Sequence, residues 1–145
     1  MKHFVSREEF DRLLGEGFFI EHAEIAGNLY GTSRKELLDL LAASPAIADL
    51  DIRGAEQLRE TLPKEALMTI FLRPSSLEEL VARLDARGPM SPEERSLRLA
   101  RIQHELDAAP SYDHVVTNAN GKLEETVEVV CDLIGKRLAS GSSAA

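Results

Sequence analysis

Two groups of acidic and polar side chains have the types and spacing that ligand binding or catalysis needs. The first is Glu21, with Tyr30 and Thr32 a short distance downstream. The second is the pair Asp49 and Asp51, which lies at the end of an apolar run predicted to form a strand. Because α/β proteins bind ligands beyond the carboxyl ends of parallel strands, these aspartates are candidate ligand-binding groups.

A third group consists of arginines on both sides of a Gly-Pro pair, and it favours a phosphate-bearing ligand. Arg83 and Arg87 are four residues apart and share one face of a predicted helix. Gly88 and Pro89 interrupt the helical pattern, so the segment is a candidate hinged flap. Guanidinium groups aimed at one place bind phosphates through paired hydrogen bonds. The other members are Arg95, Arg98 and Arg101.

A structural explanation competes with the functional one for each group. A single glutamate on a strand is often only solvated, and a helix face rich in Arg and Glu is often surface charge. No metal site is predicted, because the four histidines lack metal-ligand spacing. Cys131 is expected on the packed face of the last helix, as a small core residue.

The composition indicates an acidic globular protein and excludes several kinds of partner. The chain has 145 residues, and its formal net charge of −8 disfavours binding to nucleic acid. No apolar run approaches the roughly 20 residues of a membrane-spanning helix, so no membrane partner is expected. The single cysteine cannot form an internal disulfide, which suits a cytoplasmic location.

Four serines are predicted to begin the helices that position these groups. Each is followed three residues later by glutamate and then by apolar residues at helical spacing, which is a capping box. A last helix is predicted over residues 122–138, with Val127 and Leu138 on its buried edge, and residues 139–145 are expected to be a disordered tail. The four serines are Ser6, Ser33, Ser76 and Ser91.

Three apolar runs are short enough to be strands, and each precedes a helical segment. They are residues 47–52, 66–72 and 114–117. Strands that alternate with helices indicate βαβ units and a parallel sheet. Residues 18–30 contain a Gly-Asn turn signal between apolar stretches and are predicted to form a small antiparallel ribbon. The fold class is therefore α/β.

Four segments of the sequence resemble the guanylate kinase family. Phe19–Ser33 matches the family signature almost residue for residue, and Asp49–Ala55 is similar to its D-x-D-x-Q-G-A stretch. Residues 83–99 resemble the family's lid, and residues 112–118 resemble its last strand. The resemblance extends over residues 4–138, which is nearly the whole chain.

The resemblance implies a P-loop-NTPase-like parallel sheet flanked by helices, with a small β subdomain for GMP and a helical lid. Residues 1–138 would form this guanylate kinase-like domain, with the GMP-binding subdomain at 4–32 and the lid at 83–98. The implied reaction is phosphorylation of GMP to GDP, with ATP and Mg²⁺ as cofactors.

For GMP, the resemblance implies four binding residues. Glu21 would accept hydrogen bonds from N1–H and the 2-amino group of guanine, a pair of donors that adenine lacks. Tyr30 and Thr32 would hold the phosphate and the base. Asp51 would make a second contact with guanine.

For ATP, the resemblance implies four catalytic residues and one residue beside the adenine. Arg83, Arg87 and Arg98 would clamp the ATP phosphates and stabilise the transferring charge. Asp49 would lie near the magnesium and the phosphates, and Asn118 would lie beside the adenine.

The sequence departs from the family pattern in its first part. The P-loop, G-x-x-x-x-G-K-[ST], is absent, so the P-loop strand in the middle of the family's sheet is expected to be missing. Lys2 stands where the family has a GMP-contacting tyrosine, and Arg53 replaces its glutamine. Because the P-loop cradles the β- and γ-phosphates, we expect weak or no kinase activity from this chain alone. A P-loop-bearing fragment or a second copy would cover the open sheet edge.

Three interpretations remain open. The chain is a guanylate kinase without its N-terminal part, whether as a fragment, a misassigned start or half of a split enzyme. Alternatively, it is a non-catalytic guanylate kinase-like module that binds GMP or acidic or phosphorylated peptides. The missing P-loop favours this second interpretation, whereas the retained Glu21 and lid arginines argue against it. The third interpretation is an α/β domain whose similarity is only ancestral.

Overall fold

The computed structural model describes residues 3–25, 27–86 and 88–141. It divides into two compact units, Met1–Leu67 and Met68–Ala145, and each is described by itself. None of the helices in the described ranges combines the length and the apolar character that crossing a bilayer requires.

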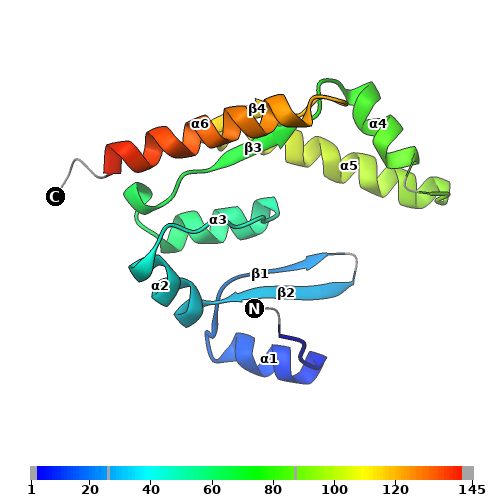
Figure 1. The fold of residues 1–145 in the computed structure, drawn as a ribbon. Coiled ribbons are helices and arrows are strands. Elements are labelled where there is room, and N and C mark those ends of the chain that lie inside the picture. Colours follow the sequence, from blue (N-terminus) through cyan, green and yellow to red (C-terminus); the bar gives the residue numbers. More distant parts are fainter. Residues whose placement is uncertain (1–2, 26, 87, 142–145) are drawn as a thin grey trace. The chain divides into compact units, whose positions relative to one another are not determined.

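In its described residues, the first unit contains a two-stranded antiparallel ribbon with three helices (Figure 1). The strands follow one another through Gly27, whose φ of 79° suits a tight turn. The predicted ribbon is therefore confirmed, and its second strand continues to Ser33. The elements are α1 (Arg7–Gly15), β1 (Phe19–Ile25), β2 (Asn28–Ser33), α2 (Arg34–Ala43) and α3 (Ile52–Thr61), followed by a 3₁₀ turn at Lys64–Ala66.

The core of this unit lies between α3 and β1. Ile20 and Ala23 of β1 and Ala55 and Leu58 of α3 are all buried. Phe10 of α1 is also buried, and its ring stacks on Phe19 with the centroids 4.5 Å apart. These contacts fix α1 and α3 against β1, the strand that carries Glu21.

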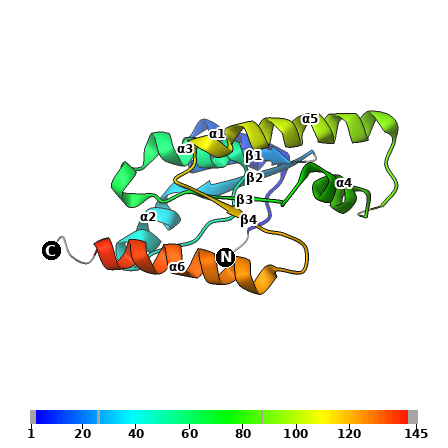
Figure 2. The same ribbon diagram turned by 90° about the horizontal axis from the view of Figure 1, so that it is seen from above.

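The second unit contains one parallel strand pair, which places Ile70 beside His114 and Arg73 beside Thr117. Figure 2 shows this pair between two long helices, α5 and α6. The parallel pairing is confirmed, and the predicted strand at residues 114–117 has the predicted bounds. The elements are β3 (Ile70–Arg73), α4 (Leu77–Asp85), α5 (Pro92–Ala108), a 3₁₀ turn at Ala109–Ser111, β4 (His114–Thr117) and α6 (Leu123–Gly141).

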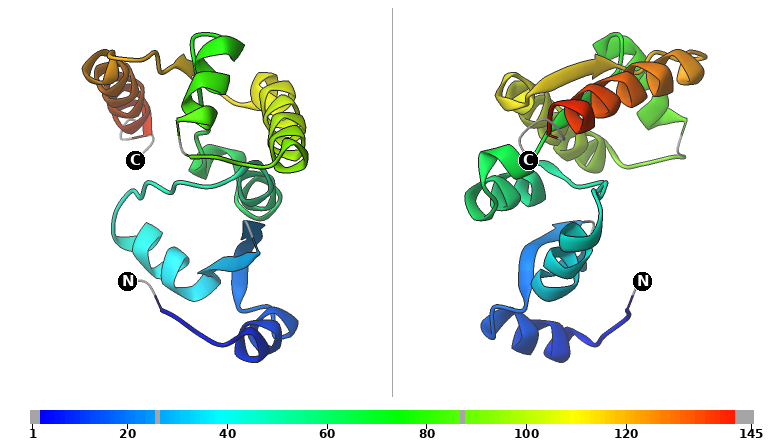
Figure 3. Two further views of the ribbon diagram at one scale, coloured as in Figure 1. Left: turned by 90° about the vertical axis from the view of Figure 1, so that its right-hand side faces the viewer. Right: turned by 60° about the vertical axis from the view of Figure 1, so that its left-hand side comes forward.

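All four predicted N-cap serines begin helices. In α1, α2, α4 and α5 the hydroxyl oxygen of the serine accepts from the backbone N–H three residues on. Ser91 forms the complete capping box, because the Glu94 side chain also accepts from its backbone N–H at 3.0 Å. Ser33 ends β2 and caps α2 at once, so α2 continues directly from the ribbon (Figure 3).

The structure corrects the strands predicted in the middle of the chain. Residues 47–50 form no regular element and pair with no described strand, and Ile47 is 84% exposed. Asp51 instead caps α3, so Asp49 and Asp51 do not follow a strand. The predicted strand at 66–72 is reduced to β3, after the 3₁₀ turn. A short apolar run becomes a strand only where another strand pairs with it.

The last helix also differs from its prediction. It continues to Gly141, three residues past its predicted end at Leu138, and residues 142–145 lie outside the described part. Cys131 is exposed, so its prediction as a core residue is wrong. Val127 and Leu138 are 50% and 47% exposed, because the two described strands of this unit offer α6 only a narrow surface.

Candidate functional site

Glu21 is a buried carboxylate on β1, with only 5% of its surface exposed. The register between β1 and β2 shifts between Phe19 and Glu21, which is a bulge in the ladder. Such a bulge re-aims the side chains beside it. Consequently Ile20 and Glu21 are both buried although they are adjacent in the strand, where burial normally alternates.

The two oxygens of Glu21 face different elements. The Thr32 hydroxyl on β2 donates a hydrogen bond to Oε1. Oε2 lies against Gly54 of α3, which is itself buried. Strand β2 and helix α3 therefore hold the carboxylate from two sides.

Asp51 borders the same place through the beginning of α3. Its carboxylate oxygen Oδ1 accepts from the Gly54 backbone N–H at 2.9 Å, as an N-cap does. Gly54 is thus the point where the carboxylates of Glu21 and Asp51 approach one another. Among the predicted GMP residues, the structure brings together Glu21, Thr32 and Asp51.

A glutamine side chain connects α3 to β1. The Gln57 amide nitrogen donates to the His22 carbonyl at 2.9 Å, and its amide oxygen accepts from the His22 N–H at 3.0 Å. The side chain therefore pairs with the strand as another strand would. It fixes α3, and with it Asp51 and Gly54, beside Glu21.

Tyr30 and Asp49 are more exposed than the other predicted residues of this unit. Tyr30 is 53% exposed and pairs with Ala23 across the ribbon. It lies two residues before Thr32 and so on the same face of β2. Asp49 is exposed in the segment that precedes α3.

In the second unit, Arg83 on α4 is held by groups of the same unit. Its Nε donates to the Asn120 side chain at 2.9 Å, and its Nη2 donates to the Asn118 carbonyl at 2.7 Å. Nη2 also forms an ion pair with Glu79. The hydroxyl and then the backbone N–H of Ser75, followed by Arg83, hold the pKa of Glu79 below its usual value, so Glu79 stays ionised.

Of the other predicted residues of the second unit, Asn118 contacts Arg83 through its carbonyl, whereas no contact joins Arg98 to Arg83 within the described ranges. Arg98 on α5 is exposed, and its guanidinium has no partner within the described ranges. Asn118 follows β4 and is half-buried, with its backbone N–H donating to the Arg73 carbonyl at 2.7 Å. Arg87 and Lys2 lie outside the described residues.

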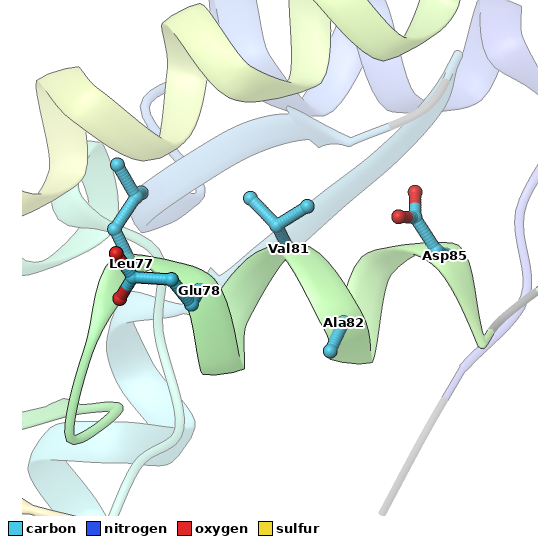
Figure 4. A pocket seen from close by; sticks show the side chains of 5 residues that line it. All are labelled: Leu77, Glu78, Val81, Ala82 and Asp85. Carbon is cyan, nitrogen blue, oxygen red and sulfur yellow. The ribbon is translucent and has the colours of Figure 1, made fainter.

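The described part of the chain contains no group of three His, Cys, Asp or Glu side chains that could hold a metal ion. A hollow on α4 is lined by five side chains of that helix alone, none of them a predicted site residue (Figure 4). Two residues lie beside Glu21 and Asp51 to which the sequence reasoning gave no role of their own: Gly54, which it noted only as following the two aspartates, and Gln57, which it did not single out. Glycine inside a helix is a signal that could have found the first, because alanine is favoured there.

A sequence model of the guanylate kinase family matches residues 2–137 of this chain. The guanylate kinase of Frankia casuarinae is 44% identical over 117 residues, which cover 80% of this chain and 62% of that protein. The guanylate kinase of Chlorobaculum tepidum is 41% identical over 137 residues, which cover 94% of this chain and 69% of that protein.

A crystal structure of guanylate kinase from Anaplasma phagocytophilum is similar with a TM-score of 0.73 and 33% identity. The alignment covers 92% of this chain and 63% of that one. This likeness confirms the predicted α/β, P-loop-kinase-like fold class. The chain spans about three fifths of the length of the first curated relatives it matches.

Proposed function

Because the chain belongs to the guanylate kinase family, we propose that it binds GMP and takes part in ATP-dependent phosphorylation of GMP to GDP. The observation that carries this proposal is the buried carboxylate of Glu21, held by the Thr32 hydroxyl. We place the protein in the cytoplasm, which suits its single cysteine.

Glu21 is assigned the recognition of guanine. Guanine presents N1–H and its 2-amino group side by side, and a carboxylate with two oxygens accepts from both. Adenine would leave the buried carboxylate without these partners, which is the condition under which a polar site rejects an analogue strongly. Asp51 is assigned a second contact with the base, and Tyr30 and Thr32 are assigned contacts with the base or the phosphate.

The phosphate side is assigned to the second unit and to Asp49. The exposed guanidinium of Arg98 supports a role in clamping phosphates, and Arg87 and Arg83 are assigned to the same function. Asn118 is assigned to the adenine side. Magnesium in such reactions is held largely by substrate phosphates with one or two carboxylates, and we assign Asp49 to it.

The proposed activity of this polypeptide by itself is weak. The sequence contains no G-x-x-x-x-G-K-[ST] motif, whose backbone and lysine cradle the β- and γ-phosphates. Loss of a single preorganised donor costs about 10²–10³ in rate. We therefore propose that a P-loop-bearing fragment, or a second copy, completes the site. The 52% exposure of Leu72 on β3 and the 41% exposure of Val115 on β4 support such a partner.

Titration calorimetry with GMP tests the assignment of Glu21. We expect GMP binding by the unsubstituted chain, and its loss in Glu21→Ala, because the carboxylate that accepts from guanine is removed. The matched control is Glu24→Ala, since Glu24 is an exposed glutamate on the same strand. Equal affinities for GMP in the Glu21→Ala variant and the unsubstituted chain would contradict the assignment.

A coupled assay for GDP formation from GMP and ATP tests the activity. We expect little turnover by this chain and more when a P-loop-bearing fragment of a relative is added. Turnover that requires neither Glu21 nor the added fragment would contradict the proposal.

A second candidate function is a non-catalytic module for acidic or phosphorylated peptides. The absent P-loop motif and the exposed guanidinium of Arg98 favour it. A phosphopeptide that binds in calorimetry, competes with GMP and is lost in Arg98→Ala would support this function over the first.

A further inference from the structure

We propose that Gly54 is the positioning residue that leaves room for the Glu21 carboxylate and thereby sets the selectivity of the site for guanine. The inference rests on the proposed recognition of guanine by Glu21. It adds a residue whose own side chain touches no ligand. Its contribution is the space that a side chain would fill.

The geometry leaves no room for a Cβ atom at this position. A Cβ built on Gly54 would lie 2.8 Å from Oε2 of Glu21, a distance that real Cβ atoms essentially never show. It would also lie 3.4 Å from Oδ1 of Asp51. Any side chain at Gly54 would therefore place its Cβ against the two carboxylates.

The backbone of Gly54 does not explain why glycine stands there. Gly54 is the third residue of α3, and its φ is not among the positive values that favour glycine. At such a position alanine is the better helix former. The requirement for glycine is therefore the space beside Glu21, and not the conformation of the chain.

The carboxylate, rather than the helix, would yield to a Cβ. The atom in the way is the end of a flexible side chain, whereas α3 is fixed to β1 by Gln57 and by buried apolar contacts. Glu21 is 5% exposed, and its Oε1 accepts from Thr32. Any displacement therefore disturbs that hydrogen bond and the pair of oxygens that reads guanine.

Two other glycines provide matched controls. Gly15 ends α1, and Gly135 lies within α6. A Cβ at either position would meet nothing within 4 Å. Alanine at these sites should leave ligand binding unchanged and should not lower the melting temperature.

A double-mutant cycle on the melting temperature tests the positioning without any ligand. It compares the unsubstituted chain with Gly54→Ala, Glu21→Ala and the double variant. We expect Gly54→Ala to lower the melting temperature when Glu21 is present and to be neutral or stabilising when Glu21 is alanine. An equal effect of Gly54→Ala in both backgrounds would overturn the proposal. If Gly54→Ala fails to fold alone but folds together with Glu21→Ala, the clash is established.

Calorimetry with GMP and AMP tests the selectivity. In Gly54→Ala we expect GMP affinity to fall by about tenfold or more, as for loss of a hydrogen bond to a charged group, while AMP affinity changes little, so that the ratio of the two affinities falls. Gly15→Ala and Gly135→Ala should retain the ratio of the unsubstituted chain. Unchanged GMP affinity in a folded Gly54→Ala variant would overturn the selectivity role. Absence of GMP binding by the unsubstituted chain would overturn the proposed function and the selectivity role with it, whereas the melting cycle would still decide the positioning.

Discussion

The candidate functional residues of the two units differ in how other side chains and backbone groups hold them. In the first unit, the Thr32 hydroxyl donates to the Glu21 carboxylate, and the carboxylates of Glu21 and Asp51 both border Gly54. In the second unit, Arg83 is held by Asn118, Asn120 and Glu79, whereas Arg98 has no partner in the described part of the chain.

This difference matches the proposed division between recognition of a base and binding of phosphates. A base-reading carboxylate must be fixed before the ligand arrives, since selectivity depends on where its two oxygens lie. A phosphate-binding guanidinium can remain exposed until the phosphate supplies its partner. By this criterion the first unit suits the proposed recognition of a base, and the exposed Arg98 of the second unit suits the proposed binding of a phosphate.

The largest expected effect comes from disconnecting α3 from β1. In Gln57→Leu the His22 N–H and carbonyl lose their partners, so the free energy of unfolding should fall by about 1–3 kcal/mol. GMP affinity should fall too, because α3 carries Gly54 and Asp51. Urea unfolding and calorimetry measure the two effects.

A glutamine of the second unit provides the control for this experiment. Gln103 is exposed on α5 and donates to Asp107 of the same helix at 2.9 Å. Gln103→Leu should change the free energy of unfolding by less than about 0.5 kcal/mol. Equal effects of the two substitutions would contradict the view that Gln57 organises the site.

A smaller effect is expected from the arginines of the second unit. Arg83→Ala should lower the free energy of unfolding by about 1 kcal/mol, because the groups that it bonds after β4 lose a donor. Arg98→Ala should have almost no effect on stability, within about 0.5 kcal/mol. Urea unfolding, with hydrogen exchange at residues 118–121, measures the stability of both variants. A larger loss of unfolding free energy in Arg98→Ala than in Arg83→Ala would contradict this expectation.

Local sequence signals predicted part of this fold. The N-cap serines and the strand at His114–Thr117 were found, since a cap depends on residues three apart and β4 is a short apolar run before a helix. The prediction of a strand at residues 47–52 was wrong, because strand pairing depends on segments that are distant in the sequence. The prediction that Cys131 is buried was wrong for a similar reason, because the burial of a helix face depends on which other elements pack against it.

The sequence proposed residues for the candidate site but not their arrangement. Glu21, Tyr30, Thr32 and Asp51 followed from the family signature. Glu21 is buried beside a bulge in the pairing of β1 with β2. Its carboxylate also approaches Gly54, which lies more than 30 residues further along the chain. No local pattern of residue types encodes such a contact.

The most direct test of the central claim is a calorimetric comparison of GMP, IMP and AMP on the unsubstituted chain. IMP keeps N1–H but lacks the 2-amino group, and AMP lacks both donors. If Glu21 accepts from both groups of guanine, GMP should bind about tenfold or more tightly than IMP, and AMP should bind most weakly. Equal affinities for the three nucleotides would contradict the account.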